Sequence, residues 1–164
     1  MSRKEVFSKT NAARALDRAG IEYELRTYIV DEEDLSAVNV ATAIGLLPEQ
    51  VFKTLVVRGD RTDVILACVP ANAELHLKAL ASASGHKRVE LVAVKEVLDL
   101  TGYIRGGVSP LGTKKPLSVF LDETAMLWDV ISVSAGVRGC QMLLAPSGLA
   151  RVTGAQLCDI ARFS

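Results

Sequence analysis

Residues 51–70, VFKTLVVRGDRTDVILACVP, contain two apolar runs separated by a short polar segment. The first run ends at Gly59 and Asp60, a pair that favours a turn, and the second continues to Pro70. Both runs are rich in valine, isoleucine and leucine and have the length of ordinary strands. The stretch therefore predicts an antiparallel β-hairpin over residues 54–70.

Helix and strand patterns alternate on both sides of this hairpin. Apolar residues at helical spacing, often closed by glycine, predict helices at residues 8–20, 36–44, 74–82, 94–100, 148–152 and 155–162. Apolar runs predict further strands at residues 21–30, 118–122, 129–135 and 141–145. A hairpin mixed with helices favours an α/β domain with a mixed sheet over a doubly wound parallel one. Since no linker or repeat separates these elements, residues 1–164 are expected to form a single domain.

The composition is that of a globular protein with balanced charge. Hydrophobic residues make up 49% of the chain, and 19 basic residues balance 19 acidic ones. Proteins that bind long stretches of nucleic acid through released counterions are usually more basic. Any nucleic-acid contact is therefore expected to be local, and to involve an end or a single strand.

The spacing of the cysteines argues against a zinc site, and the apolar segments argue against a signal peptide or a membrane span. Cys68, Cys140 and Cys158 are odd in number, far apart and without zinc-ligand spacing, so we expect ordinary buried residues. The N-terminal MSRKEVFSKTNAARAL lacks the apolar core of a signal peptide, and no run approaches the roughly 20 residues of a membrane span. We expect a cytoplasmic protein that uses no metal and no other cofactor.

Lys53 is unusual within the first apolar run. It precedes Leu55 by two positions and Val57 by four, so the three side chains share one face of the expected strand. A lysine on a buried face must line a cavity, pair with an anion or extend to water. The pattern leaves two interpretations open: a strand-end lysine that reaches solvent, or a cation in a pocket for a carbonyl oxygen or a phosphate.

Residues 103–115, YIRGGVSPLGTKK, form a glycine-rich segment with a basic end. It begins like the nucleophile elbow G-x-S-x-G, but Leu111 replaces the last glycine and Pro110 removes the backbone N–H that follows Ser109. Its threonine precedes its lysine, which reverses the order of the phosphate-binding P-loop. Two interpretations remain: a solvated turn, or a rigid loop whose bare backbone allows a ligand to approach closely.

Several motifs in order make the chain similar to the YbaK family of aminoacyl-tRNA editing proteins. They are VFKTLVV, TGYIRGGVSPLG, ISVSAGVRG and the closing CDIA, and the likeness extends from about Ala12 to Ala161. The family includes the Cys-tRNA(Pro) deacylases and the editing domains inserted in, or associated with, prolyl-tRNA synthetase. The resemblance implies a single α/β domain with a mixed, barrel-like β-sheet surrounded by helices.

The resemblance also assigns site residues to this chain. The essential lysine of the family corresponds to Lys53, which is the expected catalytic residue. The Gly-x-x-Pro-Leu loop of the family corresponds to residues 107–111, and its serine/glycine segment corresponds to residues 134–136. The residues expected to bind the substrate are Tyr28, Ser36, Gly106, Gly107, Val108, Ser109, Pro110, Leu111, Ser134, Ala135 and Gly136.

The resemblance implies an activity in translation quality control. The loop backbone would face the aminoacyl ester at the 3′ end of a mischarged tRNA, while Lys53 would hold the terminal nucleotide or the ester. For Cys-tRNA(Pro), the expected substrate, the thiol of the substrate attacks its own carbonyl, and the protein supplies orientation and charge stabilisation. A positioned water would serve for other amino acids. Prolyl-tRNA synthetase is a candidate partner, and the oligomeric state is open.

Three positions depart from the family pattern. Ser36 stands where some Cys-tRNA(Pro) deacylases have phenylalanine, Ala135 replaces a glycine, and Gln141 replaces an aspartate of some members. Because Ser36 and Gln141 are candidates for the amino-acid pocket, the identity of the edited amino acid stays open. These changes and the neutral charge also keep a second hypothesis open, a non-catalytic module that binds a nucleotide or a synthetase.

Overall fold

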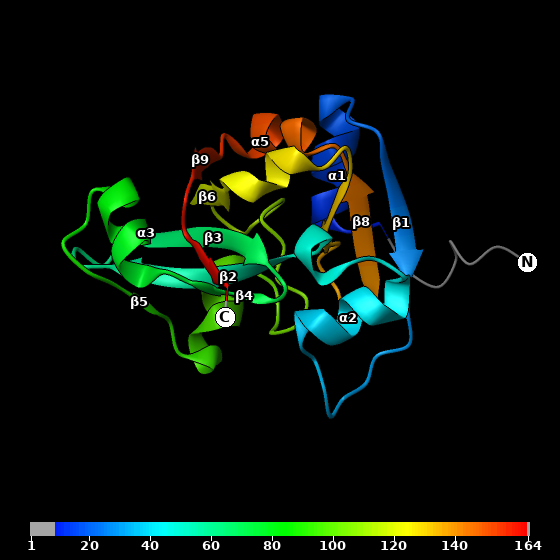
Figure 1. Cartoon of the computed structure of the whole chain (residues 1–164), viewed down its shortest axis with the longest axis horizontal. Helices are drawn as coiled ribbons and strands as arrows, with labels where there is room; N and C mark the ends of the chain where they lie inside the picture. Colours follow the sequence, from blue (N-terminus) through cyan, green and yellow to red (C-terminus); the bar gives the residue numbers. More distant parts are fainter. Residues whose placement is uncertain (1–8, 164) are drawn as a thin grey trace, which may run out of the picture.

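The computed structural model describes residues 9–163 and contains a central five-stranded sheet (Figure 1). Residues 1–8 and Ser164 lie outside the described residues. They include Ser8, the predicted start of the first helix, and the beginning of the N-terminal stretch. The strand order is β5-β2-β3-β6-β9. Strands β2 (Phe52–Gly59) and β3 (Val64–Pro70) pair antiparallel along their whole length, which confirms the predicted hairpin.

The central sheet is mixed, as predicted from the sequence. β5 (Val89–Leu91) pairs antiparallel with β2 on the outer side of the hairpin. On the other side β6 (Ser118–Asp122) pairs parallel with β3, and β9 (Gln156–Cys158) pairs parallel with β6. The helical segments between these strands provide the crossovers that parallel pairing requires.

Two smaller sheets complete the strand structure. β8 (Cys140–Leu144) pairs antiparallel with β1 (Tyr23–Thr27) and with β7 (Ile131–Ser134), and β4 (Ala73–Leu75) pairs antiparallel with β10 (Ala161–Phe163). A bridge between Val51 and Ser132 places β7 beside the start of β2. The expected barrel-like sheet is not confirmed, because the strands of residues 9–163 pair as three separate sheets.

Each α-helix within residues 9–163 ends at a glycine, and the first two begin at a hydroxyl cap. α1 (Asn11–Ala19) begins at Thr10, whose side chain accepts from the amide of Ala13, and ends at Gly20 with φ of 71°. The other helices are α2 (Ala37–Ile44), α3 (Leu77–Ser84), α4 (Val97–Thr101) and α5 (Pro146–Thr153), with 3₁₀ turns η2 (Pro48–Gln50), η3 (Val94–Glu96) and η4 (Glu123–Leu127). None of the helices within residues 9–163 has the length and apolarity to span a membrane.

The predicted helix at residues 155–162 is wrong. The chain forms β9 and β10 there, because each strand has a partner that lies far away in the sequence. The buried Asp122 fixes the turn between them: one carboxylate oxygen accepts from the amides of Ile160 at 2.9 Å and Ala161 at 2.8 Å. The helix predicted at residues 74–82 also starts late, because residues 73–75 belong to β4.

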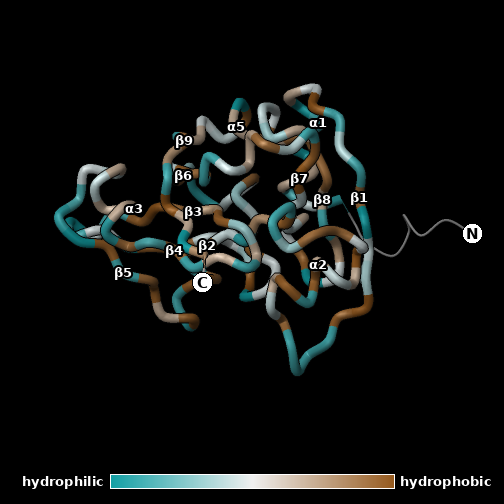
Figure 2. Tube along the Cα trace, viewed as in Figure 1, coloured by the Kyte–Doolittle hydropathy of each residue, from teal (hydrophilic) through white to brown (hydrophobic). Residues whose placement is uncertain are grey.

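The core lies on both faces of the central sheet. Phe52 and Val56 of β2 pack into the larger cluster, toward α1, α5 and the β1-β8-β7 sheet. Val57 and its partly buried neighbour Leu55 pack into a second cluster with α3. Figure 2 shows apolar segments along interior strands such as β8, and a hydrophilic loop between β1 and α2. This alternation along β2 places successive side chains on opposite sides of the sheet.

Candidate active site

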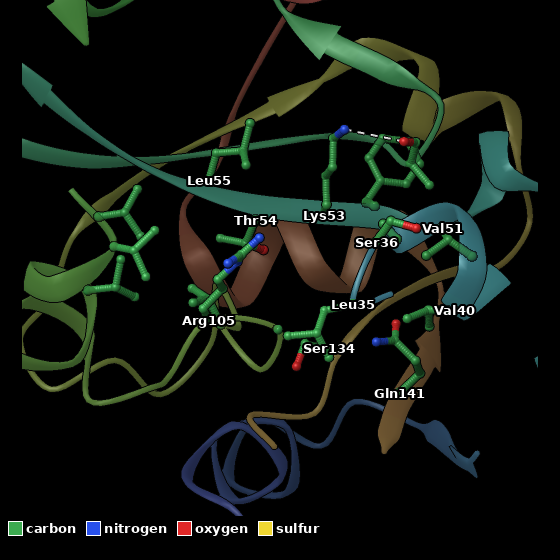
Figure 3. A pocket seen from close by; sticks show the side chains of 18 of the residues that line it. Leu35, Ser36, Val40, Val51, Lys53, Thr54, Leu55, Arg105, Ser134 and Gln141 are labelled. Atoms are coloured by element: carbon green, nitrogen blue, oxygen red, sulfur yellow. Dashed lines mark hydrogen bonds between the residues drawn. The ribbon is translucent and has the colours of Figure 1, made fainter. Parts of the chain in front are cut away.

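A cavity of about 560 Å³ lies along β2 (Figure 3). Its walls come from the loop before α2, from β2, from the segment between β5 and α4, from residues 105–108, and from β7 and β8. Residues from these distant segments therefore meet around one space. Those predicted from the sequence that line it are Ser36, Lys53, Gly106, Val108 and Ser134.

Lys53 is half-buried at the wall of this cavity. Its Nζ donates a hydrogen bond of 3.2 Å to the carbonyl oxygen of Ala71 (Figure 3). Burial lowers the pKa of Lys53 below the usual 10.5, and the carboxylate of Glu74 opposes this effect. An ammonium has three donors, and one carbonyl occupies only one of them. Lys53 therefore retains donors for a ligand.

The side chains of β2 lie on opposite sides of the strand. Lys53 and Leu55 point to one side, whereas Thr54 points to the side where Arg105 and Ser134 lie (Figure 3). All of them line the same cavity. Lys53 therefore borders the cavity from a different side of β2 than Arg105 and Ser134 do.

The glycine loop, defined here as residues 103–112, contributes backbone to the cavity wall. Gly106 lines the cavity and has φ of 86°, a value that favours glycine. Gly107 does not line it: a Cβ atom there would lie 3.1 Å from the carbonyl carbon of Val137 and 3.2 Å from the amide nitrogen of Arg138. The missing side chain of Gly107 therefore allows the loop to pack against residues 137–138.

The C-terminal part of the glycine loop is buried and does not line the cavity. Ser109, Pro110 and Leu111 are buried and are not part of the lining. The hydroxyl of Tyr103 donates to the carbonyl oxygens of Leu111 at 2.6 Å and Gly112 at 3.1 Å. Tyr103 thus fixes the far end of the glycine loop.

In the serine/glycine segment, residues 134–136, one residue lines the cavity and the other two lie behind it. Ser134 lines the cavity, and its Oγ accepts a hydrogen bond of 3.1 Å from the amide of Gly136. Gly136 has φ of 100°, and the ring of Tyr103 occupies the place of a side chain there, 2.7 Å from an added Cβ. Ala135 is buried in the core. Ala135 and Gly136 therefore shape the segment without contacting the cavity.

Ser36 and Tyr28 have different positions. Ser36 lines the cavity and caps α2, since its Oγ accepts from the amide of Asn39 at 3.2 Å. Tyr28 is not part of the lining; it packs against the small cluster that contains Ala41 and Ile44. The structure therefore brings Ser36 to the cavity and leaves Tyr28 outside it.

Several lining residues were not among the predicted site residues. Thr54 neighbours Lys53 and Arg105 precedes the glycines, so both stood next to a predicted motif. Gln141, a candidate for the amino-acid pocket from the sequence, also lines the cavity. Ser134 and Gln141 are direct partners in the β7–β8 ladder, and Ser132 Oγ donates to Gln141 Oε1 at 2.6 Å. The other lining residues that were not predicted are Glu33, Asp34, Leu35, Ala37, Val40, Val51, Phe52, Leu55, Val56, Ala71, Leu91, Val92, Val94 and Val97.

Arg138 joins two segments that contribute lining residues to the cavity. Its Nε donates to the carbonyl oxygen of Arg105 at 2.8 Å, and its guanidinium lies 3.4 Å from Glu32 in the loop before α2. The side chain also packs over Gly106, where a Cβ would lie 3.1 Å from Nε. Arg138 therefore holds the glycine loop and the loop before α2 together.

None of the three cysteines lines the cavity. Burial raises the pKa of the Cys140 thiol, and that of Cys68 to about 12. Burial and nearby carboxylates raise the pKa of Cys158 to about 11. Within residues 9–163, no group of three His, Cys, Asp or Glu side chains is arranged to hold a metal ion. A thiolate nucleophile is therefore not available in the described part of the site.

Comparisons with known proteins agree with this arrangement. A family model described as the aminoacyl-tRNA editing domain matches residues 31–152. The chain is 42% identical over 160 residues, 98% of each chain, to the "Putative Cys-tRNA(Pro)/Cys-tRNA(Cys) deacylase EbsC" of Enterococcus faecalis. It is 28% identical over 73 residues to the proline–tRNA ligase of Brachyspira hyodysenteriae, which is 44% of this chain and 13% of that one.

A solved structure supports the same relationship. The "putative trans-editing enzyme for prolyl tRNA synthetase" superimposes with a TM-score of 0.79 and 25% sequence identity, covering 99% of each chain. This match confirms the α/β class of the fold. The family model covers more than half of the chain, and the relative from Enterococcus covers nearly all of it. The chain therefore belongs to the family of aminoacyl-tRNA editing domains, the YbaK family that its motifs resemble.

Proposed function

We propose that this protein is a trans-acting aminoacyl-tRNA deacylase that releases the amino acid from mischarged tRNA. The first candidate substrate is Cys-tRNA(Pro), because the relative with 42% identity over 98% of both chains is named for deacylation of cysteinyl-tRNAs. The observation that carries the proposal is the cavity itself, where Lys53, Gly106 and Ser134 line one space of about 560 Å³. That volume lies in the usual range for small-ligand sites and suits an aminoacyl group with its adenosine.

Lys53 and the glycine loop have complementary roles in this proposal. The carbonyl oxygen of an ester gains negative charge when its carbon is attacked, and fixed donors stabilise that charge. The lysine supplies a cation that is only partly solvated, which strengthens its effect on a nearby oxygen. The loop supplies a rigid surface against which the ester is oriented.

The substrate supplies the nucleophile when it carries cysteine. The sulfur bonds to the carbonyl carbon, the bond from that carbon to the 3′ oxygen breaks, and the thiol proton ends on the 3′ oxygen. This assignment is supported by the raised pKa values of the protein's own thiols and by their positions outside the cavity lining. His76 and His86 do not line the cavity either, so the hydroxyls of Ser36, Thr54 and Ser134 have no histidine base there.

A deacylation assay tests the function directly. Purified protein is incubated with tRNA(Pro) charged with cysteine, serine or alanine, and the remaining ester is measured against incubation without protein. We expect release of cysteine well above the background rate. Cysteinyl-tRNA with a blocked thiol should be stable, because the intramolecular attack is then impossible. Binding of all three charged tRNAs without any release would instead support a non-catalytic module, the reading that the neutral net charge keeps open.

We further propose that residues 1–164 act as one editing domain in the cytoplasm, at the 3′ end of aminoacyl-tRNA. Prolyl-tRNA synthetase is the candidate partner, because part of the chain is similar to a proline–tRNA ligase and the matched solved structure is named for that synthetase. Co-purification of the two proteins with and without tRNA(Pro) tests this association.

A further inference from the structure

The buried end of the cavity contains an amide group whose orientation is fixed. Gln141 is 5% exposed and lines the cavity from β8. Its Oε1 accepts a hydrogen bond of 2.6 Å from the hydroxyl of Ser132, which is fully buried. A separation of 2.6 Å is typical of O–H···O bonds and is short for an amide donor, so the oxygen of Gln141 is the atom that faces Ser132.

The nitrogen of the same amide is turned into the cavity. Figure 3 shows Nε2 of Gln141 directed toward Ser134 and the interior, away from the strand backbone. No hydrogen bond from this nitrogen to any of the residues 9–163 is formed. Gln141 therefore presents unused N–H donors to whatever occupies this end of the cavity.

This end of the cavity is lined by buried side chains. Val51 and Val40, which line it together with Gln141, are 2% and 8% exposed, and Ser134 is 8% exposed. By contrast Val94, at the other end of the lining, is 59% exposed, and Arg105 is also exposed. A tRNA is too large to enter, so its 3′ nucleotide must stay toward the exposed end. The part of the ligand farthest from the tRNA, the amino-acid side chain, then reaches the buried end.

We propose that Gln141 is a specificity residue that donates a hydrogen bond to the side chain of the edited amino acid. The inference rests on the proposed deacylase function. A neutral N–H donor favours a short side chain that ends in an acceptor, the sulfur of cysteine or the oxygen of serine. Alanine would cover the same donor with a methyl group and leave it unpaired, which a buried site disfavours. Ser132 is a positioning residue, because it fixes which end of the amide faces the ligand.

The test compares amino acids within one variant. The kcat/KM is measured for tRNA(Pro) charged with serine, cysteine or alanine, using the wild type and Gln141→Met, which keeps the length of the side chain and removes its polarity. We expect the kcat/KM ratio of serine to alanine to fall about tenfold. The ratio of cysteine to alanine should fall less, because sulfur is a weak acceptor. Gln156→Met, on the exposed strand β9, is the matched control and should leave both ratios unchanged.

A binding measurement separates this inference from the proposed function. The Kd values of seryl and alanyl amides of 3′-amino-3′-deoxyadenosine are measured for the wild type, Gln141→Met and Gln141→Asn, with thermal unfolding to verify the fold. Both variants should lose the preference for the seryl amide. An equal loss of activity or affinity for serine and alanine, or unchanged ratios, would overturn the inference. A wild type that releases none of the amino acids overturns the deacylase function instead, and the amide affinities still test Gln141.

Discussion

The tip of the β2–β3 hairpin and the glycine loop each depend on a glycine that another residue packs against. At the hairpin, the ring of His86 occupies the space where a side chain of Gly59 would be, and its Nδ1 lies 3.1 Å from Asp60. In the glycine loop, Gly107 packs against the backbone of residues 137–138. Only the second glycine has neighbours in the cavity wall, Gly106 and Val108. Close packing at a glycine thus fixes the backbone position in both places. Only at Gly107 does the fixed backbone adjoin the cavity, so only there is it expected to matter for catalysis.

The largest effect is expected from Gly107→Val. Its Cβ would press on the backbone of Val137 and Arg138 and displace the cavity wall, and small displacements of a site cost about 100-fold or more in rate. We expect the kcat/KM for Cys-tRNA(Pro) to fall to the background rate, with a smaller loss for Gly107→Ala. Thermal unfolding shows whether the variant is folded. Normal turnover by folded Gly107→Val would show that the loop is only a bend.

Lys53→Ala should have the next largest effect. Removal of the cavity cation should lower kcat/KM about 100-fold, the usual loss for one charge-stabilising group. Stability should be kept, because the change removes a half-buried charge and opens no apolar core. Lys78→Ala, at an exposed position of α3, is the control. Wild-type kinetics in Lys53→Ala would exclude the role assigned to the lysine.

The pH dependence of the wild type tests the same residue. The pKa of Lys53 is lowered, so the lysine loses its proton at a lower pH than an exposed lysine does. Activity that depends on its charge is complete below that pKa and is lost as pH rises through it, at a value below 10.5. Release rates are corrected for spontaneous ester hydrolysis at each pH. A profile that is identical in Lys53→Ala would assign the alkaline loss to another group.

Gly59→Ala should affect stability and not catalysis. The new methyl group overlaps the His86 ring, and overpacking of this kind costs about 1–3 kcal/mol. The free energy of unfolding is measured by urea denaturation, and kcat/KM should match the wild type. In a His86→Ala background the same change should cost less, because the ring is gone. Equal costs in both backgrounds would show that the ring does not define this position.

Replacing Cys68, Cys140 and Cys158 together with alanine should also leave catalysis unchanged. The raised pKa of each thiol keeps it protonated and unreactive near neutral pH. We expect wild-type kcat/KM, resistance of the native protein to iodoacetamide, and a loss of about 1–3 kcal/mol from packing. An acyl intermediate trapped on Cys140 would contradict this expectation and the mechanism that goes with it.

Local sequence patterns predicted the helices and strands that are held by contacts within a short stretch of the chain. The hairpin at residues 54–70 has its turn and both strands in one stretch, and helices such as α1 carry their own caps. The strands at residues 156–158 and 161–163 could not be found in this way. Their partners are β6 and β4, and the carboxylate that fixes their turn belongs to Asp122, more than thirty residues earlier.

The candidate site also contains residues that local motifs could predict and residues that they could not. The motif residues Lys53 and Gly106 could be named from the sequence, and both line the cavity. The sequence could not separate lining residues from their supports, so Ser109 and Ala135 were grouped with residues that they hold in place. Nor could it reveal that Ser132 sets the orientation of Gln141, because that contact crosses two strands.

The pairing of β1 with β8 has a consequence for how the chain folds while it is being synthesised. It joins residues 23–27 to residues 140–144, so it combines the first strand within residues 9–163 with a strand that is synthesised more than a hundred residues later. Contacts that close such long loops slow folding, and β1 must wait for most of the chain to be synthesised. Until β8 emerges, β1 lacks the strand with which it pairs. A nascent chain stalled before residue 140 should therefore be a target for chaperones, whereas the hairpin at residues 52–70 can already form.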